Sequence, residues 1–221
     1  VAVVGPLADG VSLGDRGSSL VRPPSTVSVL KGLRNYVGDT AELLYDDGSD
    51  LDSAVAAAGS AGVTVVVVGY THKDEGEFIP GEMSIEGGGK EAGGDRDSLS
   101  LSAADEALVL AVAAANARTV VVVIGGSAIT MERWHHKVDA ILMLWYPGME
   151  GGHAAARLLF GEVSPSGKLP FTIPTDAAEL PFFDKDAEHI EYGMYHGYTL
   201  FDRNQLEPAY CFGFGLSYTS F

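Results

Sequence analysis

Hydrophobic residues along the chain gather in short runs that alternate with stretches of helical spacing. Most runs are rich in Val and Ile, lack period-two alternation and stop at Gly or Pro, which is typical of strands buried on both faces of a parallel sheet. Strands are predicted at residues 1–5, 41–45, 63–69, 119–126, 140–146 and 168–173. Helices are predicted between them, around residues 26–37, 51–61, 102–115 and 150–160.

This alternation predicts an α/β fold with an open, mostly parallel six-stranded sheet flanked by helices, a flavodoxin-like sandwich. We expect one domain over residues 1–221. Residues 174–221 are rich in Tyr, Phe, Gly and Pro and lack helical periodicity, so we expect an extended C-terminal tail that wraps the domain.

A long acidic loop, Tyr70 to Ser100, separates the strand at 63–69 from the next predicted helix. Connections of this kind usually span about 2–6 residues, and much longer ones are often functional. The loop leaves the carboxyl end of a predicted strand, which is where open α/β sheets bind their ligands. It is therefore the best candidate for chemistry in the chain.

The composition of the chain narrows the classes of molecule that it could bind. The chain has 14 Lys and Arg against 30 Asp and Glu, a formal net charge of −16, which disfavours nucleic acid and anionic membranes as partners. No apolar run approaches the ~18 residues of a membrane span. Cys211 is the only cysteine and the histidines lack metal-ligand spacing, so neither a metal nor a cofactor is predicted. The chain begins within a predicted strand, as a fragment of a longer protein would, and its compartment is left open.

The loop begins with three carboxyl groups around one glycine, at Asp74, Glu75 and Glu77. Two carboxylates flanking a bond can hydrolyse a glycoside, and repulsion between neighbouring carboxylates can raise a pKa so that one acts as an acid. The alternative is a solvated acidic loop. At the loop's other end, Asp95-Arg96-Asp97 indicates either an ion pair that pins the loop or an arginine that orients the acid.

Trp145 and Tyr146 end the strand predicted at 140–146. Aromatic rings at this position could stack on a sugar face, and they could equally pack in the core. Ser127 follows Gly125-Gly126 but not in the GxSxG pattern, so a nucleophilic serine is not supported.

Five stretches together resemble the second domain of the family 3 glycoside hydrolases. They are VAVVGP at 1–6, GDR with LSL at 94–101, WYPGMEGG at 145–152, FGEVSPSGKLP at 160–170 and FGFGLSYTSF at 212–221. The resemblance covers essentially the whole chain, and the joint match is highly specific.

The resemblance implies a retaining β-glucosidase or a related enzyme that hydrolyses terminal β-D-glucosyl residues. In this family the nucleophilic Asp belongs to an N-terminal barrel domain, which is absent from these residues, and a fibronectin-III-like domain often follows the sandwich. The acid/base Glu of many members lies in a Glu-Gly pair, which here matches Glu75-Gly76; Glu77 is the alternative. Substrate contacts are expected from Asp74, Arg96, Trp145 and Tyr146.

We therefore expect the chain to supply the acid/base and part of the aglycone site, and to be inactive without its barrel. One alternative is a glycan-binding module without a catalytic role. Another is a flavodoxin-like nucleotide-binding domain, which the missing phosphate-binding fingerprints disfavour.

Overall fold

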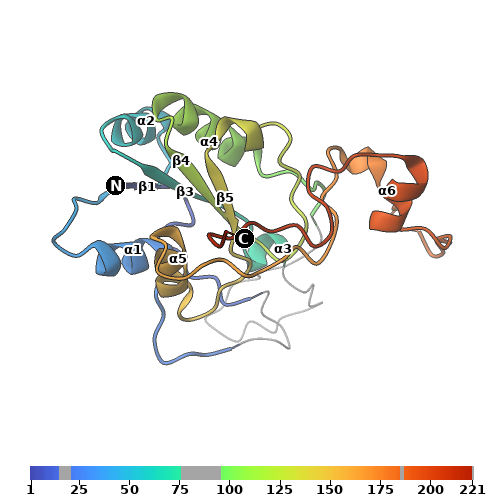
Figure 1. Ribbon diagram of the computed structural model, residues 1–221, viewed down its shortest axis with the longest axis horizontal. Helices are drawn as coiled ribbons and strands as arrows, with labels where there is room; N and C mark the ends of the chain where they lie inside the picture. The colour runs from blue at the N-terminus through green and yellow to red at the C-terminus, as the bar shows by residue number, and fades with distance from the viewer. Residues whose placement is uncertain (15–20, 76–95, 185–186, 221) are drawn as a thin grey trace.

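The computed structural model describes residues 1–14, 21–75, 96–184 and 187–220 of the chain (Figure 1). Its centre is a five-stranded sheet in the order β2-β1-β3-β4-β5, with every neighbouring pair parallel. The strands are β1 (Ala2–Val4), β2 (Leu44–Asp46), β3 (Thr64–Gly69), β4 (Thr119–Ile124) and β5 (Ala140–Met143). The predicted α/β class, with a parallel sheet flanked by helices, is confirmed.

The prediction of a sixth strand at 168–173 is wrong. This segment pairs with the C-terminal tail instead of the sheet: the Leu169 amide donates to the carbonyl of Phe214, and Ile173 and Tyr210 exchange hydrogen bonds as an antiparallel bridge. Pro170, within the segment, has no amide hydrogen to donate to a sheet ladder. The apolar side chains of this run are therefore buried, and its backbone forms its hydrogen bonds with the tail.

Two pairs of helices cover the two faces of the sheet (Figure 1). Helices α1 (Val29–Val37) and α5 (Gly151–Leu159) pack on one face, and α2 (Leu51–Gly59) and α4 (Ala103–Ala115) on the other. Along β3, Val65 and Val67 point to the α1/α5 face, while Val66 and Val68 point to the α2/α4 face. This two-sided burial explains why the strand sequence shows no polar alternation.

Helices α1 and α5 approach each other closely. A Cβ atom built on Gly32 would lie 2.0 Å from the carbonyl oxygen of Gly152, so only glycine fits at this crossing. Ser28 caps α1 by accepting a hydrogen bond from the Lys31 amide at 3.1 Å. The approach fixes the WYPGMEGG segment, whose last glycine is Gly152, against the first turn of α1.

The tail contains a helix that the sequence did not predict. Helix α6 (Tyr198–Asn204) stands away from the sandwich at one end of the molecule (Figure 1), with Phe201 as its buried residue. The remaining short elements are α3 (His72–Glu75), η2 (His135–Lys137) and η3 (Ala177–Glu179).

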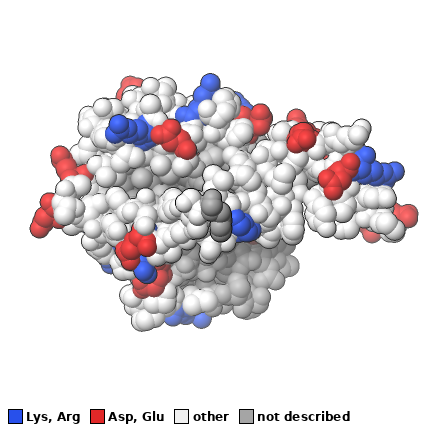
Figure 2. Space-filling view, in the orientation of Figure 1, with Lys and Arg blue, Asp and Glu red and all other residues white. Residues whose placement is uncertain are grey.

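The surface seen in Figure 2 carries acidic and basic side chains mixed together, without a broad patch of one sign. In the part of the chain that the structure describes, no helix has the length and apolar character needed to cross a bilayer.

Candidate functional site

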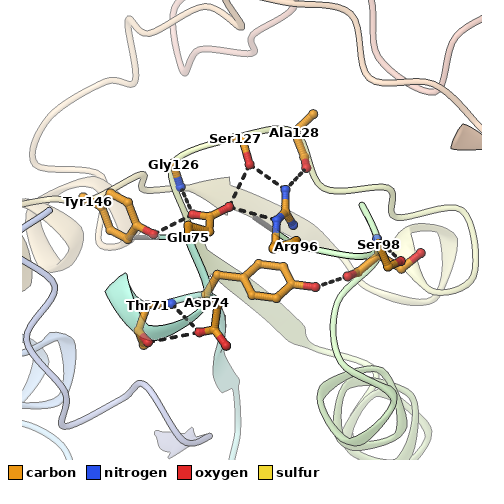
Figure 3. A network of polar contacts seen from close by, with 11 residues as sticks. Thr71, Asp74, Glu75, Arg96, Ser98, Gly126, Ser127, Ala128 and Tyr146 are labelled. Carbon is orange, nitrogen blue, oxygen red and sulfur yellow. Dashed lines mark hydrogen bonds and ion pairs between the residues drawn. The ribbon is translucent and has the colours of Figure 1, made fainter. Parts of the chain in front are cut away.

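Three loops meet at the carboxyl edge of the sheet. They follow β3, β4 and β5, and they contribute Glu75, the segment Gly126–Ala128 and Tyr146 (Figure 3). Because all five strands are parallel, these loops leave the sheet on the same side. Arg96 joins them from the far end of the acidic loop.

The one-turn helix α3 positions Glu75. Asp74 accepts hydrogen bonds from the amide and the hydroxyl of Thr71, at 2.9 and 3.0 Å, and the Thr71 hydroxyl accepts from the Lys73 amide at 3.2 Å. This reciprocal arrangement is a capping box. The carboxylate of Asp74 therefore closes the turn, and Glu75 at its end points toward the loop after β4 (Figure 3).

Every contact of the Glu75 carboxylate is with a donor. Oε2 accepts from the Gly126 amide at 2.6 Å and from the Tyr146 hydroxyl at 2.5 Å. Oε1 accepts from the Ser127 hydroxyl at 2.7 Å and lies 3.1 Å from the Arg96 Nε. The side chain is 9% exposed. Both oxygens of this carboxylate therefore act as hydrogen-bond acceptors within the protein.

Arg96 is buried in the same cluster, with 8% of its side chain exposed. Its Nη2 donates to the Ser127 hydroxyl at 2.5 Å and to the Ala128 carbonyl at 2.8 Å, and its guanidinium carbon lies 4.2 Å from the centre of the Tyr70 ring. Its Nη1 has no hydrogen-bond partner in the described structure. Arg96 thus forms an ion pair with Glu75, which lies at the other end of the acidic loop.

The Tyr146 hydroxyl approaches Glu75 past Gly126, which has no side chain to separate the two residues. A Cβ atom on Gly126 would lie 2.9 Å from Cε2 of the Tyr146 ring and 3.3 Å from Oε2 of Glu75, so a side chain there would separate the two. Burial, together with the hydrogen bond to Glu75 and the charge of Glu75, raises the pKa of Tyr146 well above its usual value. The phenol therefore remains a donor at neutral and moderately alkaline pH.

Trp145 adopts a left-handed backbone conformation with φ of 57°, one of two non-glycine residues in the described chain with positive φ. Its ring is half-buried and packs edge-on against Phe171, with the ring centres 5.5 Å apart. It makes no contact with Glu75 or Arg96 among the interactions that define the cluster. Its role in binding a sugar stays a prediction.

The predicted site residues are therefore brought together in part. Glu75, Arg96 and Tyr146 form one cluster, Asp74 adjoins it through α3, and Trp145 turns toward Phe171. Glu77 lies outside the described residues. Within the described ranges, no group of three or more His, Cys, Asp or Glu side chains is placed to hold a metal ion.

The model of the glycosyl hydrolase family 3 C-terminal domain matches residues 1–218. The chain belongs to this family. The family 3 domain is 32% identical over 259 residues to a periplasmic beta-glucosidase of Salmonella typhimurium, covering 100% of this chain and 31% of that protein. It is 34% identical over 207 residues to a beta-xylosidase of Formosa agariphila, covering 90% of this chain and 26% of that protein.

Solved structures agree with this membership. The beta-D-glucoside glucohydrolase of Trichoderma reesei superposes with a TM-score of 0.85 at 27% identity, over 99% of this chain and 33% of that one. The family 3 domain thus spans about a quarter to a third of the proteins to which it is similar. The resemblance seen in the sequence motifs is confirmed.

Sequence reasoning missed the contribution of the loop after β4. Gly126 and Ser127 each donate to Glu75, and Ala128 accepts from Arg96. The available signal was the pair Gly125-Gly126 directly after a buried strand, which indicates a close approach of another part of the chain. Nothing in the sequence indicated that the approaching group was Glu75, 51 positions earlier.

Proposed function

We propose that this family 3 domain is the second domain of a retaining glycoside hydrolase that removes terminal β-D-glucosyl or related residues. An N-terminal barrel domain of the same enzyme would supply the nucleophilic carboxylate, and the family 3 domain would supply the acid/base and part of the aglycone site. Support comes from the family match over 1–218 and from relatives named as a beta-glucosidase and a beta-xylosidase.

One observation carries the proposal. Glu75 and Arg96 flank the acidic segment 76–95, and their Oε1 and Nε atoms lie 3.1 Å apart at the carboxyl edge of the sheet. The two residues that bound this segment in the sequence therefore lie together at the edge of the sheet where α/β proteins bind their ligands. Its glutamates are Glu77, Glu82, Glu86 and Glu91.

Retaining hydrolysis needs two carboxyl groups, one as nucleophile and one as acid/base. Glu75 is the acid/base in the sequence-based hypothesis, with Glu77 as the alternative. In the described structure both oxygens of Glu75 accept hydrogen bonds from protein donors, while Glu77 lies outside the described residues, so the proposal keeps both glutamates. The acid/base role is thus proposed for this loop.

The test uses the complete enzyme, with the family 3 domain joined to its barrel. Hydrolysis of 4-nitrophenyl β-D-glucoside, β-D-xyloside and α-L-arabinopyranoside would rank the sugars, and proton NMR of the first product formed would give its anomeric configuration. Release of β-glucose from the β-glucoside supports the proposal. Release of α-glucose would contradict retention, and glucan binding without turnover would favour the glycan-binding module.

A further inference from the structure

The C-terminal tail carries large apolar side chains that face solvent. Most of the exposed large hydrophobic side chains in the described part of the chain lie between residues 182 and 218. Phe182, Phe183 and Met194 are 78%, 68% and 83% exposed, and Tyr198 and Phe212 are each 53% exposed. We call these five residues the tail surface. Exposed apolar side chains that gather on one segment, rather than being scattered singly, mark interaction sites.

The residue types of the tail surface are those of an interface core. Phe, Tyr and Met are enriched at the centres of protein interfaces, where charged residues are depleted. The rings of Tyr198 and Phe212 already lie against each other, with their centres 5.3 Å apart. The nearby Arg203 guanidinium lies 4.6 Å from the centre of the Tyr195 ring. Side chains that are arranged before binding lose less conformational entropy when a partner covers them.

The described chain gives this part of the tail little support. Helix α6, which carries Tyr198, stands away from the sandwich (Figure 1). Its seven residues bury one side chain, Phe201, which belongs to neither core cluster of the sheet. A helix this short is marginal without tertiary contacts. A partner on the tail surface would supply contacts that the described residues do not.

The tail surface is connected with the candidate functional site. Segment 210–214, which includes Phe212 of the tail surface, forms backbone hydrogen bonds with segment 169–173. The Phe171 ring in that segment packs edge-on against Trp145, which directly precedes Tyr146 of the site. A partner domain that reaches the site beside Tyr146 therefore lies next to the segments that carry the tail surface.

We propose that the tail surface binds the N-terminal domain of the same enzyme. The family match describes a C-terminal domain, and the chain spans 31% of the beta-glucosidase of Salmonella typhimurium. In the proposed function the N-terminal domain supplies the nucleophile. The two carboxyl groups of a retaining enzyme are about 5–5.5 Å apart, so that domain must cover the carboxyl edge of the sheet.

Contact at the tail surface gives the N-terminal domain a second point of attachment beside the site. Two separate contacts fix the relative orientation of two domains, whereas one contact leaves them free to rotate. The inference rests on the proposed function for the presence of the N-terminal domain, and it adds the surface on which that domain is held.

A second copy of this chain is the less favourable occupant. Acidic residues outnumber basic residues over 174–210, and the whole chain has a formal net charge of −16. Two copies that met at the tail surface would bring like charges together, which disfavours an interface. The covering face of the N-terminal domain is therefore expected to be apolar, with neutral or basic residues around it.

The test places the photoreactive residue p-benzoylphenylalanine in the complete enzyme, in place of Phe182 or Met194. Tyr36 is the matched control position, because it is an exposed aromatic residue in α1, at the opposite end of the molecule from α6 (Figure 1). Isotopically heavy and light enzyme are mixed, irradiated, digested and analysed by mass spectrometry. The isotope labels distinguish a cross-link within one molecule from a cross-link between two copies.

The probes at positions 182 and 194 should form cross-links to peptides of the N-terminal domain within one molecule, and the probe at position 36 should form none. Cross-links between heavy and light molecules would overturn the inference, because a second copy would then be the occupant. Cross-links confined to the family 3 domain or to a domain after it would also overturn it, as would an equal yield from position 36.

If the enzyme with the probe does not fold, Met194→Asp provides the second measurement. A carboxylate at this position should weaken an apolar contact, and a displacement of the domains by about 1 Å can lower kcat by about 10²-fold. Tyr36→Asp should keep the wild-type kcat on 4-nitrophenyl β-D-glucoside. An unchanged kcat for Met194→Asp would overturn the inference.

The cross-links do not depend on activity, so this inference and the proposed function can fail separately. Cross-links to the N-terminal domain in an enzyme that hydrolyses no β-glycoside would support the docking and contradict the proposed function. Hydrolysis with retention, without those cross-links, would support the proposed function and contradict the docking.

Discussion

A double-mutant cycle on Glu75 and Arg96 would measure how much their contact stabilises the domain. The two side chains are 9% and 8% exposed, and the Nε–Oε1 distance is 3.1 Å. Removing one partner of a buried ion pair leaves an uncompensated charge and typically costs about 3–5 kcal/mol. We expect Glu75→Ala and Arg96→Ala each to lower the free energy of unfolding of the chain by about 3 kcal/mol or more.

The contacts also rank the two substitutions. Glu75→Ala leaves the guanidinium of Arg96 without its counterion and removes the acceptor of three hydrogen-bond donors. Arg96→Ala leaves Glu75 with those three donors in place. Glu75→Ala should therefore be the more destabilising change. The double variant should cost less than the sum of the single losses, by about 1–3 kcal/mol, because both remove one interaction.

The matched control is the exposed pair of Arg157 and Glu162, with an Nε–Oε1 distance of 2.7 Å and 54% and 45% exposure. Its distance is shorter, yet solvent screening should limit its contribution to about 0–1 kcal/mol. Comparing the two cycles separates the effect of burial from the effect of distance.

Urea unfolding of the chain, followed by the fluorescence of Trp134 and Trp145, gives the midpoint and the slope for each variant. A lower midpoint with an unchanged slope is the expected result. Losses below about 1 kcal/mol at both positions, additive in the double variant, would refute the reasoning, since they are the behaviour of an exposed pair.

Three further predictions follow from the same cluster. The chain of residues 1–221 should show no turnover of aryl β-glucosides, because one carboxylate cannot carry out a displacement that needs two; turnover by a preparation free of host glucosidase would contradict this. Gly126→Ala should destabilise the chain by about 1–3 kcal/mol in urea unfolding, because its Cβ would lie 2.9 Å from the Tyr146 ring, whereas Gly62→Ala, with nothing within 4 Å, should have little effect. The raised pKa of Tyr146 keeps its phenol protonated in the folded chain, so stability should fall above pH ~10 as the unfolded phenol ionises, by up to ~1.4 kcal/mol per pH unit. Tyr146→Phe should remove this part of the slope, and parallel stability–pH curves for the two proteins would disprove the assignment.

The central strands were predictable because local sequence decides them. The β-branched run at 63–69 becomes β3 and the run at 119–126 becomes β4, and each is buried on both faces. The run at 168–173 also contains a buried residue, Ile173, but it pairs with a different partner, the tail around Tyr210. Hydrophobicity indicates that a segment is buried; it does not indicate which backbone it pairs with.

Helix α6 was not predicted from the sequence, for a related reason. The segment Tyr198–Asn204 spans seven residues, too few for an amphipathic period to stand out against the aromatic background of the tail. Its one buried side chain, Phe201, belongs to neither of the two core clusters of the sheet. Such a helix depends on tertiary contacts rather than on propensity.

The contacts of the candidate site were likewise only partly predictable from the sequence. The sequence drew attention to Glu75 and Arg96 near opposite ends of one acidic loop, but a Glu-Gly pair carries no information about the donors that meet the carboxylate in space. Gly126 and Tyr146 lie 51 and 71 positions away. The partners that meet the Glu75 carboxylate depend on these distant contacts, and so could only be seen in the fold.

The strained backbone at Trp145 follows from the same geometry. A non-glycine residue with φ of 57° typically costs about 1–3 kcal/mol and persists only where surrounding contacts compensate. Here the compensation lies on both sides of the peptide: the Trp145 ring packs on Phe171, and Tyr146 places its hydroxyl 2.5 Å from Oε2 of Glu75. The turn at Trp145 sends two consecutive aromatic rings in different directions, one toward the segment that the tail pairs with and one toward the loop after β3. The WYPG motif therefore connects the C-terminal part of the domain, through Trp145 and Phe171, with the Glu75 carboxylate, through Tyr146.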